Sequence, residues 1–77
     1  MIQVLLFARI QDEVGQERLE ADFAGKSIKE LKRWVEDNYA VSSLTRTMTA
    51  VNEEFAADED QLKEGDTVAF IPPVSGG

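Results

Sequence analysis

Two segments of this 77-residue chain, one near each end, are apolar on both of their faces. Residues 2–8 read Ile-Gln-Val-Leu-Leu-Phe-Ala, and residues 67–71 read Thr-Val-Ala-Phe-Ile. Because successive side chains of a strand point to opposite faces of a sheet, such runs are typical of central strands. The sequence therefore predicts a sheet with large apolar groups on each of its faces.

Only one substantial helix is predicted, over residues 28–38. Ser27 and Glu30 have the spacing of a capping box, in which the serine hydroxyl accepts from the Glu30 amide and Glu30 reaches back. Ile28, Leu31 and Val35 then form an apolar stripe at helical spacing. One helix of this length can cover one face of a sheet and leaves the other face open.

The same helix carries two opposite-charge pairs at a spacing of four, Lys32 with Glu36 and Arg33 with Asp37. This spacing predicts salt bridges along the solvent-facing side of the helix. Trp34 lies beside the apolar stripe, and we expect it to pack at the margin of that stripe.

The other predicted elements are short. They are a helix over residues 9–14 ended by Gly15, an edge strand over 17–23, a strand over 47–51, a turn at 52–54, a return strand over 55–57 and a turn over 62–66. The connector over 39–46 is expected to be pinned by Leu44. The resulting β-α-β-α-β-β-β order predicts an α+β fold, with a mixed sheet and the main helix packed on one face.

One register of the two central strands leaves an apolar cluster outside the core. If Ile2, Val4, Leu6, Val68 and Phe70 pack on the helix, then Leu5, Phe7 and Ile71 face outward, and Phe55 can join them. A cluster of that size on a small domain is typical of a partner surface. Two alternatives stay open: the register is inverted, or Trp34 and loop residues cover the second face.

The composition excludes several classes of function. The chain has no cysteine and no histidine, so disulfides, thiolate metal sites and cysteine or histidine catalysis are excluded, and zinc chemistry is not expected. Fifteen acidic and eight basic residues give a net charge of −7, which disfavours nucleic acid and anionic membrane surfaces as partners. The first residues lack the pattern of a secretory signal or a membrane span, so a cytoplasmic location is expected.

The last six residues, Pro-Pro-Val-Ser-Gly-Gly, predict an extended tail at 72–77 that follows a domain at 1–71. Pro72 and Pro73 cannot donate to a sheet ladder, and they favour an extended exit from the last strand. Gly76 and Gly77 have no side chain, so they can enter a narrow active site. The Gly77 carboxylate is therefore the candidate reactive group. It would need ATP-dependent adenylation by a separate activating enzyme, because the chain has no phosphate-binding glycine loop.

These residues resemble a known family, the small sulfur carrier subunit of molybdopterin synthase. The resemblance rests on residues 2–8, on the Val-Asn at 51–52, on Leu62, on the Gly-Asp at 65–66 and on residues 68–77. It implies a ubiquitin-like β-grasp fold with no bound cofactor. It also implies that Gly77 is adenylated, becomes a C-terminal thiocarboxylate, and gives its sulfur to cyclic pyranopterin monophosphate to form the molybdopterin dithiolene.

The resemblance further implies a large catalytic subunit as partner, in a heterotetramer, and no catalytic side chains in this chain. The residues expected to contact that partner are Phe7, Phe55, Ile71, Pro72, Pro73, Val74 and Ser75. Three alternatives use the same sequence features: a ubiquitin-like modifier that joins Gly77 to lysines, a thiamine-pathway sulfur carrier, and a plain interaction module with an idle tail.

Overall fold

The computed structural model describes residues 1–39, 41, 44 and 47–72. Its elements are β1 (Ile2–Leu6), α1 (Ala8–Val14), β2 (Arg18–Ala21), α2 (Ile28–Asn38), β3 (Met48–Val51), β4 (Glu54–Phe55) and β5 (Thr67–Ile71). The predicted order of strands and helices is confirmed. The bounds of α2 and β5 are those expected, while the strand expected at 55–57 is observed as β4.

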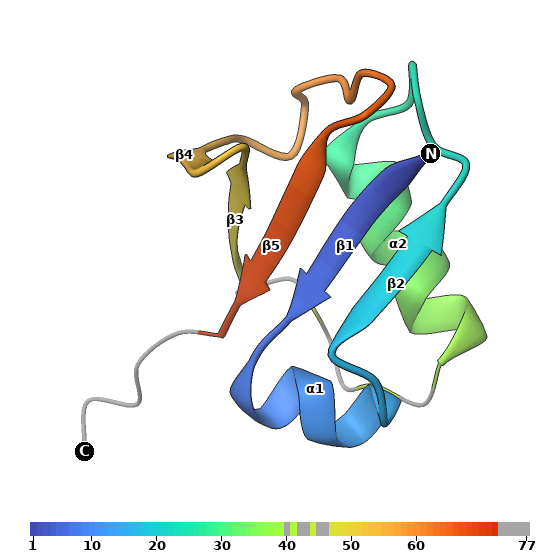
Figure 1. Cartoon of the computed structure of the whole chain (residues 1–77), viewed down its shortest axis with the longest axis vertical. Helices are drawn as coiled ribbons and strands as arrows, with labels where there is room; N and C mark the ends of the chain where they lie inside the picture. Colours follow the sequence, from blue (N-terminus) through green and yellow to red (C-terminus); the bar gives the residue numbers. More distant parts are fainter. Residues whose placement is uncertain (40, 42–43, 45–46, 73–77) are drawn as a thin grey trace.

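The strands form one mixed sheet in the order β2-β1-β5-β3-β4 (Figure 1). The central strands β1 and β5 run parallel, with Val4 opposite Val68, and the remaining neighbours are antiparallel. Strand β2 lies at one edge of the sheet, as its alternating sequence predicted. The α+β class is therefore confirmed, and the two apolar segments pair with each other in the middle of the sheet.

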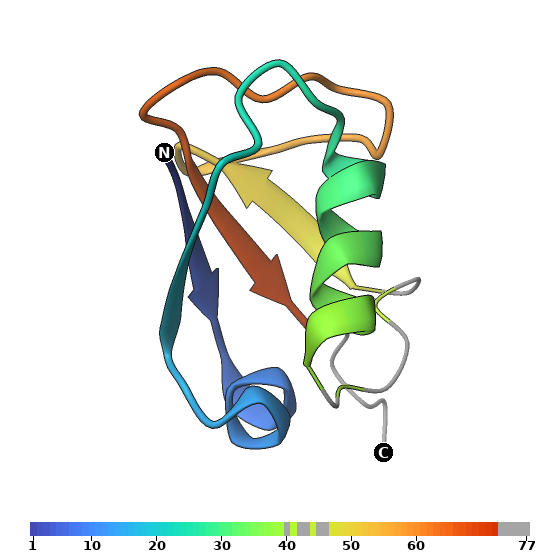
Figure 2. The same ribbon diagram turned by 90° about the vertical axis from the view of Figure 1, so that its right-hand side faces the viewer.

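Helix α2 lies across one face of the sheet (Figure 2). Its start is fixed by Ser27, whose hydroxyl accepts from the Glu30 amide at 3.2 Å. The Glu30 carboxylate accepts from the same hydroxyl at 3.4 Å, so the capping box closes through the serine side chain.

The core lies between α2 and the sheet, and its members are the inward residues of each. Ile28, Leu31 and Val35 of the helix have no exposed surface. The strand residues facing them are at most 1% exposed: Ile2, Val4, Leu6, Val68 and Phe70. This is the register that leaves an apolar cluster outside, so the inverted register is wrong.

Trp34 packs at the margin of this core, as predicted. Its ring lies 5.5 Å from the Phe23 ring and 5.9 Å from the Tyr39 ring, measured between centroids. These contacts hold the indole on the helix side of the sheet. The alternative that Trp34 covers the outer face is therefore wrong.

The predicted Lys32–Glu36 salt bridge is wrong. Lys32 is 7% exposed, and its ammonium group contacts an Asp58 oxygen at 2.8 Å and the Thr47 carbonyl oxygen at 3.3 Å. Glu36 instead accepts from the Leu44 amide at 2.6 Å, and Leu44 is buried as expected. The physical reason is tertiary, because segments distant in sequence cover this side of α2 and compete with the local partner.

Candidate partner-binding site

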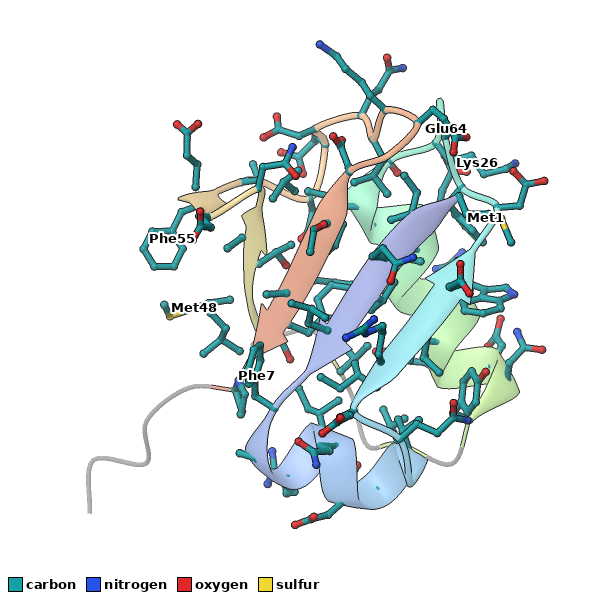
Figure 3. All side chains as sticks on the ribbon, viewed as in Figure 1. Met1, Phe7, Lys26, Met48, Phe55 and Glu64 are labelled. Carbon is teal, nitrogen blue, oxygen red and sulfur yellow. The ribbon has the colours of Figure 1, made fainter. Side chains whose placement is uncertain are left out.

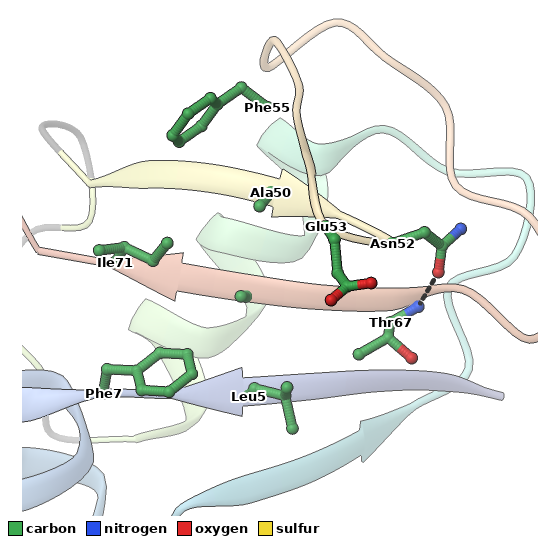
Figure 4. Close-up of a pocket in the computed structure, with 9 residues that line it drawn as sticks. Leu5, Phe7, Ala50, Asn52, Glu53, Phe55, Thr67 and Ile71 are labelled. Atoms are coloured by element: carbon green, nitrogen blue, oxygen red, sulfur yellow. Dashed lines mark hydrogen bonds between the residues drawn. The ribbon is translucent and has the colours of Figure 1, made fainter.

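The face of the sheet opposite α2 carries a shallow hollow of about 680 Å³ (Figure 4). It extends across β1, β5 and β3 and is bounded by the turn that joins β3 to β4. Nine residues line it: Leu5, Phe7, Ala50, Asn52, Glu53, Phe55, Thr67, Ala69 and Ile71.

The floor of the hollow follows from strand alternation and from side-chain size. Leu5, Ala69 and Ala50 lie beside one another across three neighbouring strands. Each follows or precedes a buried residue, so all three point away from the helix. Because two of them are alanines, the centre of the face is low, and larger side chains stand around it.

Large apolar side chains stand around this floor. Phe55 is 74% exposed, Phe7 is 44% exposed, and Met48, close to them on β3, is 45% exposed (Figure 3). Ile71, the last residue of β5, is half-buried and lines the hollow. The expected outward direction of Phe7, Phe55 and Ile71 is confirmed, and their contact with a partner stays a prediction.

One end of the hollow is polar, because the β3–β4 turn closes it. The Asn52 side-chain oxygen accepts from the Thr67 backbone N–H at 3.0 Å, and the Asn52 backbone N–H donates to the Thr67 carbonyl oxygen at 2.8 Å. The Asn52 side-chain nitrogen donates to the Asp66 carboxylate at 2.9 Å. Three hydrogen bonds thus tie the turn to the start of β5 and fix the position of the next residue, Glu53.

The predicted tail begins beside this hollow. Ile71 lines the hollow and ends β5, and the half-buried Pro72 follows directly. The other tail residues proposed from the sequence, namely Pro73, Val74, Ser75, Gly76 and Gly77, lie outside the described residues. The position of Ile71 means that the chain leaves the sheet next to the apolar surface.

Sequence reasoning missed Met48, Ala50 and Glu53 as members of this face. Alternation gave a usable signal for Met48 and Ala50, because both flank Thr49 and must point to the face opposite it. In the structure Thr49 points inward and is 3% exposed. Glu53 gave no such signal, because its position over the hollow depends on the conformation of the turn.

The lining of this face is mostly uncharged. Among the described lining residues, one, Glu53, carries a charge. Within the described ranges no three His, Cys, Asp or Glu side chains are grouped so that they could hold a metal ion. In the same part of the chain, neither helix has the length and hydrophobicity needed to cross a bilayer.

A five-stranded mixed sheet with one principal helix across one face defines a β-grasp protein. The small archaeal modifier protein 1 of Methanosarcina acetivorans has this fold, with a TM-score of 0.79 over 99% of this chain and 95% of that one at 21% identity. The complex of subunits 1 and 2 of the Helicobacter pylori molybdopterin-converting factor contains a similar chain, with a TM-score of 0.60, 23% identity and coverage of 99% and 97%.

Sequence comparison gives the family. Residues 4–77 match the model of the ThiS family. The molybdopterin synthase sulfur carrier subunit of Haemophilus influenzae is 33% identical over 81 residues, and the alignment covers 100% of both chains. This chain belongs to the ThiS family, and the resemblance and fold expected from its sequence are confirmed.

Proposed function

We propose that this chain is the sulfur carrier subunit of a molybdopterin synthase. The observation that carries the proposal is the similarity, over the whole chain, to curated relatives with that name from several organisms. The exposed apolar face beside the end of β5 supports it, because a subunit needs a surface on which its partner can dock.

The cargo is a single sulfur atom on Gly77. In the activation step, a Gly77 carboxylate oxygen attacks the α-phosphate of ATP on a separate enzyme, and pyrophosphate leaves. A nucleophile at the oxidation level of sulfide then attacks the acyl carbon and displaces AMP, and the product is a thiocarboxylate. That group is a soft anionic nucleophile whose sulfur attacks an electrophilic carbon of cyclic pyranopterin monophosphate. Water then cleaves the bond between that sulfur and the Gly77 carbonyl carbon and restores the carboxylate. Two such transfers build the molybdopterin dithiolene.

The two parts of the chain divide this work. Residues 1–71 form the domain that docks, and residues 72–77 form the tail that delivers the sulfur. Six extended residues span about 20 Å, which is enough to enter an active site on a docked partner. Within the tail, Pro73, Val74, Ser75 and Gly76 connect the docked domain to the reacting atom on Gly77.

The remaining chemistry belongs to partners. The activating enzyme supplies ATP chemistry, and the large catalytic subunit supplies the groups that bind the pterin substrate in a heterotetramer. The chain itself binds no cofactor and works in the cytoplasm, where ATP is available. Its net charge of −7 suits partners with basic surfaces, since opposite charges accelerate association.

Intact-mass analysis tests this function. After incubation with the activating enzyme, ATP and a sulfur donor, the protein should gain the mass of one oxygen replaced by sulfur. A variant lacking Gly77 should keep its fold and gain nothing, whereas Asp37→Asn, an exposed change on α2, should react like the wild type. Sulfur incorporation into the variant lacking Gly77 would exclude Gly77 as the carrier, and isopeptide adducts on lysines would indicate a modifier instead.

A further inference from the structure

The two residues of the β3–β4 turn are an unusual sequence for the backbone conformation that they adopt. Asn52 and Glu53 have φ angles of +51° and +72°, so the two-residue loop has the left-handed backbone of a type I′ hairpin. Asparagine is favoured at the first position of such a turn and glycine at the second. Here the second position is Glu53, whose Cβ makes a positive φ unfavourable.

This strain has a visible result at the hollow. The Glu53 side chain extends from the turn over β5, toward the polar end of the apolar face (Figure 4). A glycine would satisfy the turn better and would leave that end of the hollow without a charge. Backbone outliers of this kind are enriched at functional sites, so the conformation of Glu53 motivates a functional hypothesis.

Among the described residues that line the hollow, Glu53 carries the one charge, and its carboxylate is available to a partner. The nearby Asp66 carboxylate accepts from the Asn52 side chain at 2.9 Å and from the Lys63 amide at 2.8 Å. Within the described part of the chain, no hydrogen bond or ion pair engages the Glu53 carboxylate, and the residue is exposed.

We propose that Glu53 is a specificity contact for the docking partner, and that it pairs with a lysine or arginine of the large synthase subunit. That basic side chain would lie next to an apolar side chain of the same partner seated between Phe7 and Phe55. This inference rests on the proposed function and adds to it the chemistry of the partner surface. Charge complementarity supports it, because a single anion at the edge of an apolar hollow selects a cation that is flanked by apolar groups.

Calorimetric titration with the large subunit tests the contact. At about 50 mM salt, Glu53→Gln should weaken binding about fivefold, and the difference should shrink at about 500 mM salt because ions screen the pair. The matched control is Glu54→Gln, which removes the same charge one residue away from a side chain that does not line the hollow. It should bind within about twofold of the wild type.

A second variant separates the strain from the charge. Glu53→Gly should raise the melting temperature by about 3 °C through relief of the left-handed backbone, and it should weaken binding as Glu53→Gln does. Wild-type affinity in Glu53→Gln at low salt would overturn this inference alone. If the wild-type chain does not bind the large subunit, the proposed function fails and the inference fails with it.

Discussion

The two faces of the central sheet have similar apolar side chains but different surroundings. On the inner face, Val4 and Phe70 are covered by α2 and have no exposed surface. On the outer face, the same strands present Leu5 and Ile71 around a hollow, and Phe55 of the neighbouring hairpin is 74% exposed. The inner residues are explained by folding. The outer ones gain little from folding, and the proposed partner would account for their apolar character.

The largest expected effect is on the inner face. Phe70→Ala removes a fully buried ring from the middle of the core, so it should lower the free energy of unfolding by about 3–5 kcal/mol. Urea denaturation followed by circular dichroism measures this loss. A loss below about 1 kcal/mol would contradict the division between the faces, since surface substitutions fall in that range.

The matched change on the outer face should affect binding. Phe55→Ala removes a ring of the same kind, and it should leave the urea midpoint almost unchanged because the ring contributes little to the core. Affinity for the large subunit should fall about 30-fold, as expected for an aromatic anchor. Full affinity in this variant, measured by calorimetry, would remove Phe55 from the docking surface.

A smaller effect is expected where a cation is buried beside the core. Asp58→Asn leaves the ammonium group of Lys32, a residue that is 7% exposed, without its counter-charge. Because Asp58 itself is partly exposed, we expect a loss of about 1–2 kcal/mol in chemical denaturation. Lys32→Met keeps the length of the side chain and removes the charge, so it should be better tolerated. Greater destabilisation by Lys32→Met would show that the hydrogen bond to Thr47 matters more than the ion pair.

The smallest expected change is a gain in stability. The Thr49 hydroxyl points into the core and has no hydrogen-bond partner among the described residues. Thr49→Val replaces it with a methyl group of similar shape and should raise the free energy of unfolding by about 0.5–1 kcal/mol. Thermal melting of the two proteins compares them directly. A lower melting temperature would mean that a residue outside the described ranges satisfies the hydroxyl.

Sequence patterns predicted most of the fold because the decisive signals are local. The capping box at Ser27 and the stripe from Ile28 to Val35 gave the helix bounds. Gly15 and Gly65 were expected to end a helix and to form a turn, and both have positive φ angles of +84° and +88°. The sequence left open which face of β1 packs on α2, because residues 2–8 are apolar on both faces.

The errors and omissions arose where distant segments meet. Lys32 was assigned to Glu36 because helical spacing ignores Asp58, which lies 26 residues away in the chain. The depth of the outer hollow depends on two alanines from β3 and β5 that become neighbours only in the sheet. The position of the Glu53 side chain over the hollow depends on a left-handed turn. The dipeptide Asn-Glu does not predict such a turn, since these turns favour Asn-Gly.

The parallel pairing of β1 with β5 also determines how the domain responds to mechanical force. Because the strands run the same way, the start of β1 and the end of β5 lie at opposite ends of the pair. Tension applied between Ile2 and Ile71 would therefore slide one strand along the other and load all of their hydrogen bonds together. A hairpin pulled from its open end would lose its bonds one at a time. The domain should thus resist tension applied between its first strand and the end of β5.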